Sequence, residues 1–185
     1  MQALLYGIIL YLSLSLSPGP RTQSLLRKSD KNVLLKQNLA DVVFSLTLLC
    51  FAAVWRFWMS DSQLIVVTIV FYILFAASVF FSPLKRLTTV SAVKTPFASS
   101  LANYGIWFDV VLPCAITLAC LVDVDSDLLL SSAGYFMAAV SFNSGLFYFS
   151  HRINYAFWSA CRLLMLVLLL MITLLLLISL SHRFG

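Results

Sequence analysis

Asp109 is the residue of this chain whose type and position most clearly offer chemistry. It lies near the middle of the apolar stretch 98–122, and Pro113 follows it four residues later. Because proline has no backbone N–H, it cannot donate to the carbonyl of residue 109, so Asp109 presents a carboxylate and a freed carbonyl oxygen. An acid within a membrane span indicates by default a substrate, ion or proton site. The alternative is a structural acid that accepts hydrogen bonds from Ser, Tyr or Arg of a neighbouring helix.

Two further polar residues stand in or at the edge of apolar stretches. Asp41 opens the stretch 39–58, where it fits a binding site or a position at the membrane interface equally well. Asn143 lies within the stretch 128–149, and an amide in such a place more often joins helices than binds a ligand. We therefore treat Asp41 as a candidate for substrate binding or ion coupling, and Asn143 as a contact between helices.

The sequence pairs no nucleophile with a base. His151 and His182 stand at the boundaries of apolar stretches, and no serine has a His or Lys at a defined spacing. The four cysteines show no CxxC pattern and no nearby His, so we expect them to be small packing residues rather than ligands of a metal. We expect no enzyme activity, no cofactor and no metal site.

Two sites interrupt the apolar stretches in ways that a continuous helix resists. In Ser17-Pro18-Gly19-Pro20, two prolines lack the N–H that a helix needs, and glycine adopts backbone angles that other residues avoid. Unpaired backbone groups are costly in hydrocarbon, so this break should line a cavity or be buried in protein. A plain helix end at the interface is the alternative, since Arg21 follows at once. Gly105 and Pro113 loosen the stretch around Asp109 in the same way.

The composition places all these residues in a membrane. Of 185 residues, 62% are hydrophobic and only 10% are charged, whereas a water-soluble domain has roughly a quarter of charged residues. Six stretches approach the roughly 20 apolar residues that cross a bilayer, namely 3–19, 39–58, 64–82, 98–122, 128–149 and 163–180. We predict an all-α integral membrane protein with six transmembrane helices in a single domain, 1–185.

The charges predict which way the helices point. Ten of the twelve Lys and Arg residues fall in the segments 20–38, 83–97 and 150–162, which alternate with the aspartate-bearing segments 59–63 and 123–127. The positive-inside rule therefore puts the three basic segments in the cytoplasm and both termini outside. Basic residues confined to short loops are typical of orientation in a membrane, so the net charge of +5 does not indicate a nucleic-acid partner. Arg21, Asp41 and Asn103 then lie toward the cytoplasm, as a vestibule leading to Asp109.

Three landmarks together resemble the LysE-type family of lysine, arginine and RhtB-like exporters. Gly7 followed by the Leu-Ser-Pro-Gly-Pro run at 16–20 looks like the family's PGP signature. The run 39–43 is similar to the opening of its second helix. The run 102–109 falls where basic-amino-acid exporters have Leu-Asn-Pro and then an Asp five residues after the Pro. Tyr104 replaces that Pro, and Arg21 replaces the Gln or Asn that usually follows PGP, so the chain looks like a divergent member.

The resemblance implies a secondary transporter in a bacterial inner membrane that exports a small, basic amino acid, coupled to a proton or another ion. It implies two inverted three-helix repeats with broken helices 1 and 4, and a homodimer in the lipid bilayer. The residues carried over are Asp109, Asp41 and Asn103 for substrate binding or coupling, Arg21 for a vestibule, and Pro18, Gly19, Pro20, Gly105 and Pro113 for the helix breaks. A non-transporting membrane scaffold or subunit is the alternative function, and a metal-cation exporter is the third.

Overall fold

The computed structural model describes residues 2–16, 25–26, 31–81, 111–121, 125–153 and 155–184. Six α-helices fill this part of the chain. They are α1 (Gln2–Ser15), α3 (Lys31–Trp58), α4 (Asp61–Phe81), α7 (Leu112–Leu121), α8 (Asp125–Tyr148) and α9 (Tyr155–Phe184), with a short 3-10 helix at Ser150–Arg152. No strand occurs within these residues, so the prediction of an all-α fold is confirmed for them.

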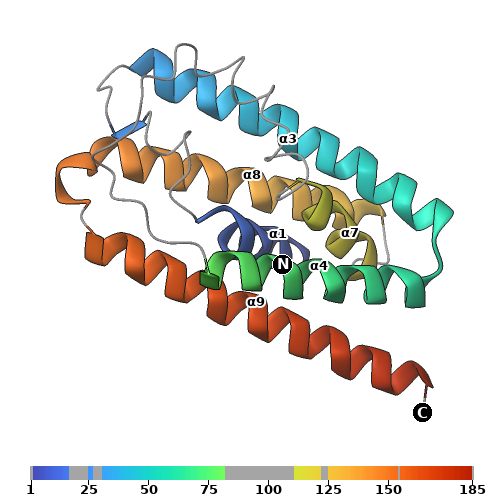
Figure 1. Cartoon of the computed structure of the whole chain (residues 1–185). Helices are drawn as coiled ribbons and strands as arrows, with labels where there is room; N and C mark the ends of the chain where they lie inside the picture. The colour runs from blue at the N-terminus through green and yellow to red at the C-terminus, as the bar shows by residue number, and fades with distance from the viewer. Residues whose placement is uncertain are drawn as a thin grey trace.

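The helices form one closed bundle. α3, α4, α8 and α9 lie lengthwise beside one another, with α1 and α7 between them. α4 and α8 run in the direction opposite to that of α3 and α9 (Figure 1). The packed pairs follow a ring, α1 on α8, α8 on α3, α3 on α7, α7 on α4, α4 on α9 and α9 on α1. α1 and α7 also touch across the middle. Every helix is thus in contact with at least two others.

The spacing of buried residues along α9 explains how this helix packs against the others. Its buried residues recur every three or four positions and make one inward stripe, at Cys161, Met165, Leu169, Ile172 and Leu176. Its other faces carry exposed leucines over four turns, from Leu163 to Ile178. An α-helix has 3.6 residues per turn, so this spacing puts all five buried side chains against the bundle. The outward faces of α9 are also apolar, whereas a helix that faces water normally carries polar residues on its outward face.

α1 and α8 cross so closely that their contact depends on glycine. A Cβ atom added to Gly7 would lie 1.8 Å from the backbone oxygen of Ser131, and one added to Gly134 would lie 2.1 Å from that of Leu4. The Ser131 hydroxyl donates to the carbonyl oxygen of Ala3 at 2.7 Å across the same contact. Small residues that let two backbones approach, together with hydrogen bonds between helices, are the usual means of joining helices in membranes.

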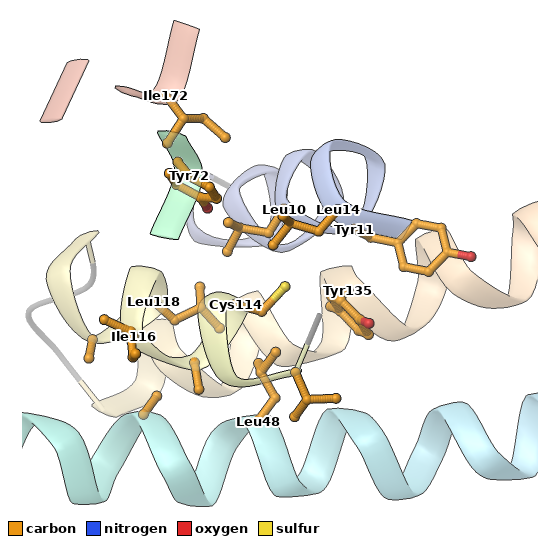
Figure 2. Packing of buried hydrophobic residues seen from close by; sticks show 14 of the residues in the cluster. Leu10, Tyr11, Leu14, Leu48, Tyr72, Cys114, Ile116, Leu118, Tyr135 and Ile172 are labelled. Atoms are coloured by element: carbon orange, nitrogen blue, oxygen red, sulfur yellow. The ribbon is translucent and has the colours of Figure 1, made fainter. Parts of the chain in front are cut away.

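The core lies where α1, α7 and α8 meet α3 and α4. Leu10 and Leu14 of α1 face Leu118 and Cys114 of α7 there, and Leu48 of α3 closes the cluster from below (Figure 2). The described part of this centre is packed with leucine, isoleucine, alanine and aromatic side chains. Buried polar side chains enter it at a few points only, and those points define the candidate site.

Several helix boundaries differ from the predicted spans. α3 and α9 each begin eight residues earlier than the stretches 39–58 and 163–180. The helices continue through charged residues because the thickness of a bilayer limits only the apolar part of a helix. The helix itself can extend beyond that part. Two described helical segments, Lys31–Trp58 and Ala156–Ile178, are long and apolar enough to cross a membrane. Length and composition alone would admit a core helix of a water-soluble protein equally well, so six membrane crossings stay a prediction.

Candidate functional site

Three polar side chains of α3 and α8 form an amide–acid cluster, which we define as Asn38, Asp41 and Asn143. The Nδ2 group of Asn143 donates to Oδ2 of Asp41 at 2.7 Å and to Oδ1 of Asn38 at 3.1 Å. Asp41 is only 1% exposed and Asn143 is 6% exposed. A buried carboxylate is stable when donors of this kind are aimed at it, because burial without them would be costly.

The position of Asp41 in α3 explains its burial. Gln37, Asp41 and Ser45 are separated by four residues each, so they lie on one face of α3 together with Ala40 and Phe44, and all of these residues are buried. Asp41 lies ten residues after the start of α3, about 15 Å along the helix, and its side chain is buried in the helix bundle. Whether this depth corresponds to the membrane interface or to the membrane interior stays a prediction.

Chemically, the amide–acid cluster can hold a cation or exchange a proton. Carboxylate and amide oxygens are hard donors that suit ammonium groups and small metal cations. A carboxylate that meets a neutral amide can also take up a proton without losing a partner of opposite charge. Acids in transmembrane helices usually have one of these two functions.

A second pair of buried polar side chains, which we define as the hydroxyl cluster, consists of Tyr72 and Thr117. The Thr117 hydroxyl lies 2.8 Å from that of Tyr72 and 2.7 Å from the carbonyl oxygen of Pro113. Ser13 of α1 is also fully buried, and its hydroxyl donates to the carbonyl oxygen of Leu10 at 2.9 Å. The hydroxyl cluster thus joins α4 to α7 in the core, where Figure 2 shows Tyr72.

The two clusters differ in depth along the bundle. Asp41 precedes the end of α3 at Trp58 by 17 residues, about 26 Å, and Tyr72 follows the start of α4 at Asp61 by 11 residues, about 17 Å. Because the α3–α4 turn joins these two ends, the hydroxyl cluster lies roughly 9 Å nearer to that turn. Thr68, one turn nearer still, contacts Cys120 of α7 with 3.3 Å between oxygen and sulfur.

The structure accounts for only some of the residues that the sequence singled out. It brings Asp41 together with Asn143, and it puts Pro113 in the first turn of α7, where a missing N–H costs least. Seven residues lie outside the described part of the chain, namely Asp109, Asn103, Gly105, Pro18, Gly19, Pro20 and Arg21. Asn38 and the hydroxyl cluster were not predicted, because their partners are set by helix neighbours that a sequence pattern does not reveal.

The remaining reactive residues of the described part offer no separate site. In the residues that the structure describes, no three of His, Cys, Asp and Glu gather as a metal site would require. Cys50, Cys114, Cys120 and Cys161 form no disulfide there, and Cys114 and Cys161 are buried. The candidate site is therefore the amide–acid cluster, with the hydroxyl cluster beside it.

Comparison with known proteins gives no relative to set beside this geometry. No protein-family model matches the chain, and neither a curated protein nor a solved structure does.

Proposed function

We propose that this chain is a six-span integral membrane protein, and its distribution of polarity supports this proposal. Serine, threonine, asparagine, glutamine and aspartate side chains are buried between the helices, while large apolar side chains cover the outside of α3, α4 and α9. A water-soluble protein rarely exposes a continuous apolar surface of this size. In lipid the same surface costs nothing, and polar groups are drawn inward to one another.

The two ends of the bundle carry the features of two membrane interfaces. Exposed aromatic residues end α3 at one end, Phe57 and Trp58, and end α8 at the other, Tyr148 and Phe149 (Figure 1). Tyr and Trp favour the headgroup level of a bilayer. Lys31, at the start of α3, lies at the end opposite to the acid-bearing start of α4. This agrees with a cytoplasmic basic end and with both termini outside.

The packing pattern supports two inverted repeats of three helices. Exchanging α1, α3 and α4 for α7, α8 and α9 converts the α1–α8 contact into the α7–α3 contact, and the α1–α9 contact into the α7–α4 contact. The other three major contacts, α3–α8, α4–α9 and α1–α7, map onto themselves. α3 and α8 run in opposite directions, and so do α4 and α9, as a membrane-plane two-fold axis requires (Figure 1).

Within that fold we propose a secondary transporter that exports a small, basic amino acid from the cytoplasm. The observation that carries the proposal is Asp41, an acid buried between two helices and held by the amide of Asn143. Asp41 would attract the cationic group of the substrate or carry a coupling proton. Asp109 and Asn103 would complete the site from the fourth span, on the strength of the sequence resemblance.

The test is export of labelled lysine, arginine and neutral amino acids from vesicles that contain the chain, its Asp41→Asn variant, or no added protein. We expect the variant to lose at least tenfold in export rate, because an amide neither binds a cation as a carboxylate does nor carries the proton. Asp127→Asn removes an exposed acid at the opposite end of the bundle and should leave export unchanged. Export by the Asp41→Asn variant at the unsubstituted rate would refute the assignment of Asp41.

A second candidate function is a non-transporting membrane subunit, and the packed centre favours it. The described core is filled by Leu10, Leu14, Leu48, Leu118 and neighbouring apolar side chains. A transporter with this packed centre must also adopt a conformation in which the centre is open to its substrate. Absence of export for every amino acid in vesicles that contain correctly folded chain would establish the subunit in place of the transporter.

A further inference from the structure

Arg162 lies in the second turn of α9, where its guanidinium group contacts the end of α4. Its Nη2 group donates to the carbonyl oxygens of Val79 and Phe80. These carbonyls belong to the last turn of α4, which has no further helical N–H to offer them. The end of a helix also carries a partial negative charge, so a cation at this place stabilises α4.

The contact with α4 uses only part of the guanidinium group. An arginine has five N–H donors, and the two bonds to α4 take the two hydrogens of Nη2. Within the described part of the chain, the Nε and Nη1 groups of Arg162 have no acceptor and no acid stands beside them. The exposed aspartates of that part, Asp61 and Asp127, lie in the first turns of α4 and α8, at the opposite end of the bundle (Figure 1). Arg162 is partly exposed, so a partner from outside the chain can reach it.

Two lines of exposed apolar side chains begin at this arginine. The line on α4 consists of Phe80, Ile73 and Val66, and the line on α9 consists of Leu163, Leu170 and Leu177. Within each line the residues are seven apart, close to two turns, so each line follows one face of its helix. α4 and α9 are antiparallel and pack against each other, and both lines therefore run from Arg162 toward the opposite end of the bundle (Figure 1).

The charges favour a lipid over a second copy of the chain as the partner of this face. A second copy in the same membrane orientation has its own basic end at the level of Arg162, and its exposed acids in the described part are at the other end. A phospholipid offers a phosphate and two acyl chains at matching levels, since Arg162 directly precedes the predicted apolar stretch 163–180. Arginine binds phosphate through two parallel N–H donors, which matches the donors left on this group.

We propose that the outer surface of α4 and α9 holds one anionic phospholipid, with its phosphate on Arg162 and its acyl chains along the two apolar lines. Lys31, Lys36 and Arg152 are exposed at the same end of the bundle and favour a headgroup with a net negative charge. The lipid would then complete the contacts of the arginine that joins α9 to the end of α4. This inference rests on the membrane location proposed above and is independent of export.

The test is thermal unfolding in detergent with added phosphatidylglycerol or phosphatidylcholine of the same acyl chains. We expect phosphatidylglycerol to raise the unfolding temperature by roughly 5–10 °C more, the shift for a ligand at about 100 times its Kd. Arg162→Gln should reduce this difference between the two lipids at least twofold. Arg152→Gln makes the same change in net charge at an exposed position of the same end and should keep the difference.

The readout is a difference between two lipids, so the lost contact with α4 in Arg162→Gln does not enter it. If that variant does not fold, Arg162→Lys decides, because a lysine keeps the charge but loses the paired donors. Its affinity for phosphatidylglycerol in native mass spectrometry should be at least threefold weaker than that of the unsubstituted chain, and an unchanged affinity would refute the site. Equal effects of the two lipids on the unsubstituted chain would also refute it, as would an equal loss in Arg152→Gln.

Two further measurements identify the ligand and the level at which the inference fails. Inorganic phosphate should leave the unfolding temperature unchanged, and a shift as large as that from phosphatidylglycerol would replace the lipid by a free anion. The chain should also stay in vesicle membranes during extraction with alkaline carbonate. If it stays and the two lipids act alike, the lipid site is refuted while the membrane location stands. If carbonate releases the chain, the membrane location and the lipid site are refuted together.

Discussion

Asn143 uses both hydrogens of its side-chain amide inside the bundle, one on Asp41 and one on Asn38. The sequence indicates that such an amide joins helices, and the structure shows which helices these are. The contact is stronger than one between two neutral groups because the acceptor is a carboxylate. An acid on α3 and an amide on α8 thus fix the separation and register of two helices that are about 100 residues apart in the chain.

The first prediction concerns that amide. Asn143→Ala removes a donor from a buried carboxylate, and we expect the free energy of unfolding to fall by about 1–2 kcal/mol, since buried groups that lose a partner bear the cost of desolvation. Thermal unfolding in detergent measures the loss. Ser141→Ala, two residues away on an exposed position of α8, is the matched control and should change little. Equal stability of Asn143→Ala and the unsubstituted chain would show that the hydrogen bonds contribute nothing.

The hydroxyl cluster leads to a second prediction at the same scale. Thr117→Val keeps the shape of the side chain but removes the hydroxyl that lies between Tyr72 and the carbonyl oxygen of Pro113. We expect a loss of about 1 kcal/mol in the free energy of unfolding, because the fully buried Tyr72 hydroxyl loses its hydrogen bond with Thr117. Thr47→Val, which removes a hydroxyl bonded only within α3, is the control. A larger loss in the control than in Thr117→Val would contradict the role of the cluster.

At the scale of helices, the contact between α1 and α8 depends on the absence of two Cβ atoms. Gly7→Ala should push the backbones apart, because its Cβ would lie 1.8 Å from an oxygen that cannot move without its helix. We expect the free energy of unfolding to fall by about 1–3 kcal/mol, the usual cost of overpacking. Loss of the Ser131–Ala3 hydrogen bond would accompany it.

Gly145 of α8 provides the control for that prediction. No atom lies within 4 Å of a Cβ added there, so Gly145→Ala should instead stabilise α8 by up to about 1 kcal/mol through the higher helix propensity of alanine. Thermal unfolding of the two variants in the same detergent tests the expected loss of stability in one and the expected gain in the other. A destabilised Gly145→Ala protein together with an unaffected Gly7→Ala protein would mean that the close approach is elsewhere.

The sequence predicts the helices better than it predicts their contacts. An apolar run identifies each of the six α-helices, because hydrophobic length is a local property of the sequence. The starts of α3 and α9 are missed by eight residues each, since Lys31, Lys36 and Arg162 are charged yet remain helical. Arg162 shows why, as its charge is bound by the last carbonyl oxygens of α4, a partner more than 80 residues away in the chain.

Two members of the amide–acid cluster were singled out from the sequence, Asp41 as a candidate for binding and Asn143 as a contact between helices. Asp41 stands out because an aspartate next to an apolar run is unusual, whereas Asn38 and Thr117 look like ordinary polar residues until their neighbours are known. The order of the ring, in which α8 lies between α1 and α3, decides that Asn143 meets Asp41. That order depends on which helix faces fit together, and a single sequence carries little information on it.

At the scale of the whole molecule, the orientation in the membrane is directly testable. Lys36 and Asp127 are both exposed and lie at opposite ends of the bundle. In a chain without its native cysteines, Asp127→Cys should react with a membrane-impermeant maleimide on intact spheroplasts. Lys36→Cys should react only after the membrane is permeabilised, because the proposed topology puts the basic end in the cytoplasm. Labelling of Lys36→Cys in intact spheroplasts would reverse the proposed topology.

The contact between α1 and α8 also sets a condition on how the protein is made. α1 has its tightest neighbour 128 residues later in the chain, as the bond from Ser131 to Ala3 shows. At about 5–20 residues per second, synthesis of that interval takes roughly 6–25 s. If the chain is the membrane protein proposed above, the glycine surface of α1 lies in the bilayer during this time without the helix that it fits. Nascent chains that stall before α8 should therefore be the form that proteases or other helices of the membrane capture first.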